Sequence, residues 1–157
     1  MALRLKAHQW PSRLAVGAFI LDAGLTKRAA DEQAAAALHG LASGAFPVLK
    51  RLDARTFTNL LSWGEVTLGA GLLLPLVPAG VAGVGLAAFS AGLLGLYLRT
   101  PGMRREGSLR PTEQGVALAQ NAPMLGIALG FIVEDLIRTD RLAGKSRNRR
   151  QSRPMSA

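Results

Sequence analysis

The sequence contains no cysteine among its 157 residues. Without thiols the chain can form no disulfide, no thiolate nucleophile and no thiolate-bound metal site, so thiol redox chemistry by this chain alone is excluded. Histidine is almost as scarce, with only His8 and His39, which disfavours a histidine-rich metal site. We therefore predict no metal ligands and no protein-bound cofactor.

Aromatic residues are also few, at 5% of the chain, although 49% of the residues are hydrophobic. Long runs of Gly, Ala, Leu and Val are typical of helices packed in lipid, where small residues let backbones approach. The chain has 19 Lys and Arg against 10 Asp and Glu, and these cations cluster at the ends of apolar runs and in the C-terminal tail. No basic and aromatic residues interleave, so the composition predicts a lipid bilayer, and not a nucleic acid, as the partner.

Charge is absent between Glu65 and Arg99. A membrane span needs about 20 residues, so this stretch is too long for one span. The sequence PLVPAG, residues 75–80, lies in its middle, and its prolines and glycine end one helix and start another. We predict spans over about residues 58–76 and 79–98.

Another uncharged run covers residues 115–133. Pro111 and Thr112 precede it and supply a helix start, which predicts a span over about residues 114–134.

The first apolar segment, about residues 13–28, is shorter and contains Asp22. By length alone it fits a buried or interfacial helix. Trp10 at one end and Lys27 at the other suit the membrane–water interface, so we expect it to span.

Together these segments predict an all-α fold, a four-helix transmembrane bundle with short amphipathic helices between the first and second spans. Residues 1–12 form an N-terminal segment, residues 13–137 the membrane domain, and residues 138–157 a basic, disordered tail. That tail carries seven Lys and Arg residues and is interpreted as a solvated flank, with binding to anionic headgroups as the alternative. The Lys and Arg residues divide almost equally between the two sides of the predicted bundle and do not set its orientation.

Two predicted helices carry small residues at intervals of four. Such stripes suit close helix contact, either within the chain or across a homodimer. Their members are Gly83, Ala87, Ala91 and Gly95 in the third span, and Ala122, Gly126 and Gly130 in the fourth.

Polar residues inside spans are the candidate site. An ionisable side chain there costs roughly 2.5–3.5 kcal/mol on insertion scales, so each is a functional hypothesis by default. The helical rise places Asp22, Glu65, Gln120 and Asn121 in the half of the bundle opposite the N-terminus, with Lys27 at the rim. These five residues predict a polar crevice that binds a ligand or carries a proton, and Glu65 is the deepest of them.

Each candidate also has a purely structural interpretation. Asp22 can form an ion pair with Lys27 or Arg28 at the interface. Glu65 can hydrogen-bond a neighbouring helix, and the two amides can hold helices together.

Two stretches carry a resemblance to a known family, RLAVGAFILDAGLTK in the first helix and WGEVTLGAGLLLPL in the second. They resemble the DoxX-like family of small bacterial membrane proteins, over about residues 13–137. Arg13, Leu14, Gly17, Gly24 and Lys27 approximate the family pattern in the first stretch, where Phe19 stands one residue early, and Glu65, Gly69 and Gly71 match it in the second.

The resemblance implies a multi-pass protein of the bacterial cytoplasmic membrane with four helices and both termini cytoplasmic. It also implies an association with quinone-coupled oxidation of sulfur compounds, or with thiol and oxidative-stress assemblies. The chain departs from the family in its long basic tail, and its lack of cysteine argues against a direct thiol role.

We therefore expect a non-catalytic subunit of a redox-associated membrane assembly, with membrane-protein partners or a homodimer. The alternative is a binder or carrier of a small lipophilic molecule, such as a quinone, in the crevice. No recognisable nucleophile, metal site or cofactor motif favours an enzyme, and Glu65 alone is weak evidence for proton transfer.

Overall fold

The computed structural model describes residues 7–151, and the surroundings of the side chains from 8 to 139. Over that range the chain is helical and has no strand, which confirms the all-α prediction. The elements in chain order are η1 (Ala7–Gln9), α1 (Trp10–Arg28), α2 (Glu32–Ala45), η2 (Pro47–Arg51), α3 (Ala54–Leu73), α4 (Ala79–Arg99), α5 (Val116–Ala119) and α6 (Asn121–Gln151).

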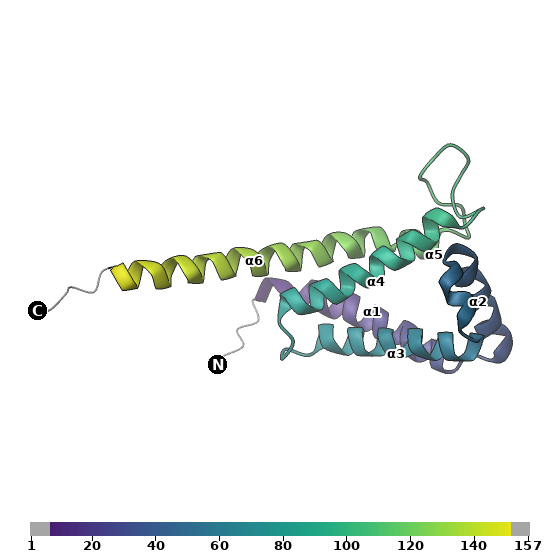
Figure 1. The fold of residues 1–157 in the computed structure, drawn as a ribbon, viewed down its shortest axis with the longest axis horizontal. Helices are drawn as coiled ribbons and strands as arrows, with labels where there is room; N and C mark the ends of the chain where they lie inside the picture. Colours follow the sequence, from purple (N-terminus) through teal and green to yellow (C-terminus); the bar gives the residue numbers. More distant parts are fainter. Residues whose placement is uncertain (1–6, 152–157) are drawn as a thin grey trace, which may run out of the picture.

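The long helices associate as two antiparallel pairs, α1 with α3 and α4 with α6 (Figure 1). Helices α3 and α4 follow each other through a short turn and share a smaller interface. Helix α2 lies across one end of the pairs and packs against α3 and α4. Helix α6 extends past the other helices at the opposite end (Figure 1).

An apolar core joins the two pairs. Buried side chains from α1, α3, α4 and α6 meet in one cluster, which consists of Val16, Ile20, Leu72, Ala82, Leu86, Ala128 and Phe131. This cluster lies nearer to the end where the α3–α4 turn is found, because its α3 and α4 members flank that turn in the sequence.

Glycine permits the closest helix contacts. A Cβ atom on Gly69 of α3 would lie 2.7 Å from the backbone nitrogen of Leu21 in α1. A Cβ atom on Gly83 of α4 would lie 2.9 Å from the carbonyl oxygen of Ala128 in α6. Gly83 is a member of the predicted stripe in the third span, but Gly126 and Gly130 of the other stripe meet nothing within 4 Å.

Helix α3 starts and ends earlier than predicted. Asp53 caps its N-terminus, because the Asp53 carboxylate accepts a 2.9 Å hydrogen bond from the backbone N–H of Thr56. The helix ends at Leu73, and Leu74 is extended because the ring of Pro75 disfavours a helical conformation in the preceding residue. Helix α1 likewise begins at Trp10, with a proline in its first turn.

The fourth predicted span is divided into two helices. Helix α5 ends at Ala119 and α6 begins at Asn121, because Pro123 has no N–H to donate to the Ala119 carbonyl. The Asn121 side chain instead donates a 3.0 Å hydrogen bond to the carbonyl of Leu118. Pro123 therefore coincides with a break in the helix beside Asn121.

Helix α6 continues to Gln151. The structure thus has helix over residues 138–151, where the sequence predicted a disordered tail. The rest of that predicted tail, and the first six residues of the predicted N-terminal segment, lie outside the described residues.

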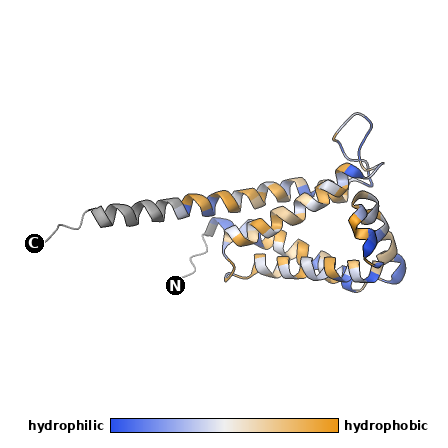
Figure 2. Cartoon of the chain, in the orientation of Figure 1, coloured by the Kyte–Doolittle hydropathy of each residue, from blue (hydrophilic) through white to orange (hydrophobic). Residues whose placement is uncertain are grey.

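Two helical segments of the described chain are long and apolar enough to cross a membrane, Ala79–Arg99 and Val116–Thr139. They correspond to the third and fourth predicted spans. Figure 2 shows hydrophobic residues along all four long helices and hydrophilic residues near α2 and the loop after α4. Helices α1 and α3 carry more charged residues than α4 does.

Candidate functional site

One end of the helix pairs is closed by Arg13. Its side chain is 1% exposed, and its guanidinium donates hydrogen bonds of 2.7 to 3.1 Å to backbone carbonyls at the end of α3 and in the following turn. The four acceptors are the carbonyls of Gly71, Leu72, Leu74 and Val77. A cation at a helix C-terminus is favourable, and Pro75 lacks the N–H that would otherwise pair with Gly71.

The same end is joined to α6. The Gln9 side chain donates a 2.6 Å hydrogen bond to the Glu134 carboxylate, and His8 Nε2 lies 3.1 Å from the other carboxylate oxygen. These contacts tie the start of α1 to α6. All four long helices are therefore held together at this end.

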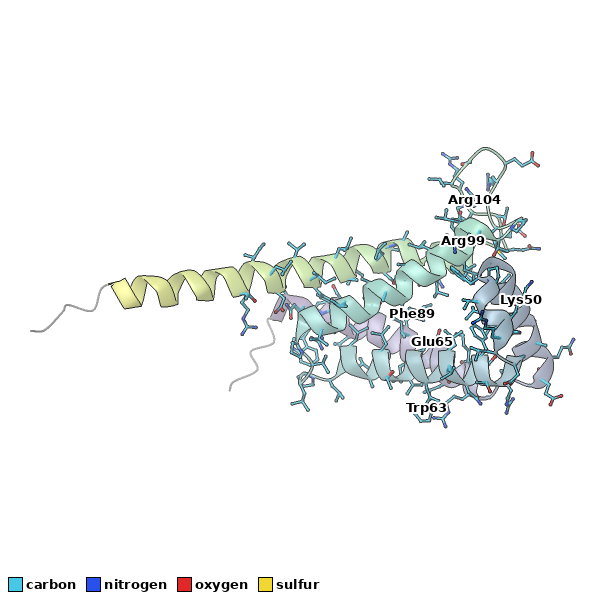
Figure 3. The ribbon with its side chains drawn as sticks, viewed as in Figure 1. Lys50, Trp63, Glu65, Phe89, Arg99 and Arg104 are labelled. Atoms are coloured by element: carbon cyan, nitrogen blue, oxygen red, sulfur yellow. The ribbon has the colours of Figure 1, made fainter. Side chains whose placement is uncertain are left out.

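At the other end the helices separate around a cavity of about 460 Å³. Helices α1, α3 and α4 form its sides, α5 and the start of α6 contribute one wall, and α2 lies across the end. The lining is largely apolar. Figure 3 shows Glu65 and Phe89 in the space between α3 and α4, whereas Trp63 points away from it.

Phenylalanine is concentrated around this cavity. The chain has five phenylalanines, and four of them line the cavity, Phe19, Phe46, Phe57 and Phe89. They come from α1, from the end of α2, from α3 and from α4, so no local sequence pattern reveals the cluster.

Phe46 helps to hold α2 in place. Its ring lies 3.1 Å from the position that a Cβ atom on Gly95 would occupy, so the absence of a side chain there lets the ring approach α4. The Arg99 guanidinium lies 4.9 Å from the ring centroid, within range of a cation–π contact. The end of α2 is thereby fixed against α4 at the cavity.

An ion pair between Lys27 and Glu65 stands in the cavity wall. Glu65 is 2% exposed, and Lys27 Nζ lies 2.9 Å from each of its carboxylate oxygens. Only Oε1 lies in hydrogen-bond geometry, and Oε2 is buried without a hydrogen-bond partner in the described part of the chain. Lys27 Nζ makes a second, longer bond of 3.4 Å to the carbonyl of Ala23.

The structure brings together four of the five predicted site residues. Glu65, Lys27, Gln120 and Asn121 line the cavity, whereas Asp22 is exposed and does not. The alternative pairing of Asp22 with Lys27 is not found, because Lys27 pairs with Glu65. The predicted polar crevice is accordingly an apolar cavity with a few polar groups.

Neighbouring polar residues have structural contacts instead. The guanidinium of Arg28 lies 4.2 Å from the ring centroid of Trp63. The hydroxyl of Tyr97 donates a 2.7 Å hydrogen bond to the carbonyl of Leu109, which attaches the loop after α4 to that helix. No group of three or more His, Asp or Glu side chains suited to a metal ion occurs in the described residues.

The sequence patterns did not indicate that Arg13 binds the backbone carbonyls at the end of α3. The available signal was Pro75, whose missing N–H leaves a carbonyl of the preceding turn in need of a donor. That signal does not say which side chain supplies the donor, because Arg13 lies 58 residues away from Gly71 in the sequence.

Comparison with protein-family models, curated proteins and solved structures gives no match for this chain. The resemblance to the DoxX-like family therefore stays a prediction.

Proposed function

We propose that the chain is an integral membrane protein in which α1, α3, α4 and α6 cross the bilayer as a four-helix bundle. Large apolar side chains on all four helices are exposed, among them Leu25, Leu60, Val81 and Leu136. In water such a surface promotes association, whereas lipid tails solvate it. The two segments with the length and composition of spans support the same proposal.

Three of the charged residues of α1 and α3 fit this proposal because the protein satisfies them internally, whereas Asp22 is exposed on α1. Arg13 is buried against backbone carbonyls, and Lys27 is paired with Glu65. An ionisable residue in a span is tolerated where it faces the bundle interior and has a partner. Their charge lowers the hydropathy of α1 and α3 without placing these three groups in lipid.

We further propose that the protein binds a small lipophilic molecule in the cavity. The observation that carries this proposal is the cavity itself, because ligand sites are typically 300–1,000 Å³, mostly apolar, and supplied with a few placed polar groups. Here the Lys27–Glu65 pair and the amides of Gln120 and Asn121 are those groups.

Other expectations from the family resemblance stay predictions. These are the cytoplasmic membrane of a bacterium, the cytoplasmic termini, a quinone as the lipophile, and membership of a redox-associated assembly with protein partners or a homodimer. The cavity supports the binding role more directly than the role of a non-catalytic subunit.

Filling the cavity tests the proposal. Gly92 lines the cavity, and a Cβ atom there meets nothing within 4 Å, so Gly92→Leu adds volume without a backbone clash. Gly64→Leu is the matched control, because Gly64 is equally open but lies outside the cavity lining.

The measurement is native mass spectrometry of the full chain extracted gently from its own membrane. We expect a bound small-molecule mass in the wild type and in Gly64→Leu, and its loss in Gly92→Leu. Retention of the bound mass in Gly92→Leu, or the absence of any bound small molecule from the wild type, would refute the proposal.

A further inference from the structure

We infer that a second pocket, in the loop after α4, binds the phosphate group of an anionic phospholipid. This pocket has a volume of about 350 Å³ and is formed within residues 100–109. It is separate from the apolar cavity, because no residue lines both. The inference goes beyond the proposed ligand of the cavity, but it rests on the proposed membrane bundle, because the crossing of the bilayer by α4 sets the position of the loop.

The loop has a defined shape, because hydrogen bonds join its two sides and attach it to α4. The backbone N–H of Arg105 donates a 2.9 Å hydrogen bond to the carbonyl of Arg110. The Tyr97 hydroxyl donates a 2.7 Å bond to the carbonyl of Leu109. Gly107 takes a left-handed conformation, with φ of 66°, which a residue without a Cβ atom adopts at little cost. The pocket therefore exists before a ligand arrives, which lowers the entropy cost of binding.

Two arginines of the pocket lining have unused hydrogen-bond donors. The Arg104 guanidinium donates a 3.0 Å hydrogen bond to the carbonyl of Leu98, and Arg105 Nε donates a 3.4 Å bond to the carbonyl of Pro111. Both side chains are exposed, and neither forms an ion pair with a described residue. Figure 3 shows Arg104 on the loop beyond the end of α4. Because a guanidinium has five N–H donors, most of those on each arginine remain for a ligand.

The charge of the pocket lining favours an anion. Arg104 and Arg105 outnumber Glu106, the acidic residue of the lining, which is exposed and pairs with neither arginine. Ser108 also lines the pocket, and its hydroxyl accepts a 3.1 Å bond from the N–H of Arg110 but has no acceptor for its own proton among the described residues. Guanidinium groups bind phosphate oxygens through paired, charge-assisted hydrogen bonds. The lining is therefore suited to a phosphate group.

The position of the pocket indicates a phospholipid as the source of that phosphate. Helix α4 ends at Arg99, just after the exposed Leu98. In the proposed bundle the helix leaves the hydrocarbon region there, so the loop lies at the level of the headgroups. Leu109 lines the pocket as well and is 72% exposed. A phospholipid supplies a phosphate together with apolar groups that contact this leucine, whereas a free phosphate ion supplies no such contact.

The test measures which phospholipid the protein retains. The full chain, purified in detergent, is mixed with equal concentrations of phosphatidylglycerol and phosphatidylcholine that have the same acyl chains. Both lipids contain a phosphate, but the choline group of the second cancels its charge. Native mass spectrometry compares the bound masses. We expect phosphatidylglycerol to bind the wild type about tenfold more tightly, as two basic residues near an anionic group provide.

Three variants locate that preference. Arg104→Gln/Arg105→Gln removes both guanidinium groups, and we expect it to lose most of the preference. Lys50→Gln/Arg51→Gln is the matched control, because it removes two adjacent, exposed cations outside the pocket lining, and it keeps the preference. Glu106→Gln removes the opposing carboxylate and should increase the preference, which a purely structural role of the loop would not produce. Far-UV circular dichroism checks that each variant keeps its helix content.

A large molar excess of inorganic phosphate distinguishes the two sources of the phosphate group. Phosphatidylglycerol that stays bound to the wild type supports the phospholipid. Its replacement by a bound phosphate ion overturns the assignment to a lipid.

The remaining outcomes separate this inference from the proposed function. Equal binding of both lipids to the wild type, or an equal loss of preference in the two double variants, overturns the inference. A carbonate wash of the membranes tests the membrane bundle itself. A chain that the wash releases contradicts both, whereas a chain that stays in the membrane without a lipid preference contradicts only the phosphate pocket. The Gly92→Leu comparison decides separately whether the cavity binds a lipophile.

Discussion

Replacing Arg13 by methionine tests how the closed end of the helix pairs is stabilised. Arg13 is almost completely buried and supplies hydrogen bonds to four carbonyls around the α3–α4 turn. One of these, Leu74, also accepts a 3.4 Å bond from the backbone N–H of Val77. The substitution therefore leaves the carbonyls of Gly71, Leu72 and Val77 without a donor.

The expected loss follows from these three groups. A buried acceptor without a partner costs about 1–3 kcal/mol, and removing one side of a buried charged contact costs about 3–5 kcal/mol. We expect Arg13→Met to lower the free energy of unfolding by about 3–5 kcal/mol, which is a large fraction of the roughly 5–15 kcal/mol that stabilises a typical protein.

Arg13→Lys is expected to fall between the wild type and Arg13→Met. Lysine keeps the charge, but its three N–H donors radiate from one atom and cannot span carbonyls that the planar guanidinium reaches with separate nitrogens. The control is Arg138→Met, because Arg138 is exposed on α6. This substitution removes the same groups without uncovering buried acceptors.

The assay is unfolding of the purified protein by sodium dodecyl sulfate in mixed micelles, followed by far-UV circular dichroism. Two results would refute the reasoning. One is an Arg13→Met variant within about 1 kcal/mol of Arg138→Met, since surface substitutions commonly change stability by less than that. The other is an Arg13→Lys variant as stable as the wild type.

Two further predictions use the same unfolding assay. Gly69→Ala is expected to destabilise the protein by a net ~1–2 kcal/mol, because the overlap of its Cβ atom with the backbone of α1 outweighs the helix propensity that alanine adds. In the control Gly64→Ala the new Cβ atom meets nothing within 4 Å, so this variant should gain up to ~1 kcal/mol of stability. Equal stabilities of the two variants would contradict the close α1–α3 contact. The backbone N–H of Thr56 holds the pKa of Asp53 below its usual value, so the ionised cap contributes its full stability above the ordinary aspartate pKa of about 3.9 and loses it as the pH falls through the lowered pKa. The destabilisation in Asp53→Ala should therefore shrink over that acidic range, whereas Asp53→Asn keeps an uncharged cap. An effect of Asp53→Ala that does not change with pH would contradict the ionised cap.

The sequence alone predicted several elements because their signals are local. Residues 79–98 differ by one residue from α4, since a proline lies immediately before the helix and a charged residue at its end. The break at PLVPAG and the all-α fold follow from equally local chemistry. Depth counted from flanking charges also placed Glu65, Gln120 and Asn121 in one half of the chain's helices, where they line one cavity.

Other features failed or escaped sequence reasoning because they depend on contacts between distant segments. Asp22 was predicted in the same half of the bundle as Glu65, Gln120 and Asn121, but the rotation of α1 about its axis places Asp22 outside the cavity. The glycines that matter for packing are those that face another backbone, as Gly69 does and Gly126 does not. Periodicity identifies a helix face but not the helix that it meets.

Local signals along the chain set the helical class, the main breaks between helices, and the half of the molecule in which the polar residues lie. These depend on proline, on helical rise and on charge, which act within one or two turns. The folded arrangement of the helices was needed to establish that Arg13 binds the carbonyls at one end, that Lys27 pairs with Glu65, and that four phenylalanines surround a cavity. Each of these needs helix axes and rotations, and packing between elements far apart in the chain sets those.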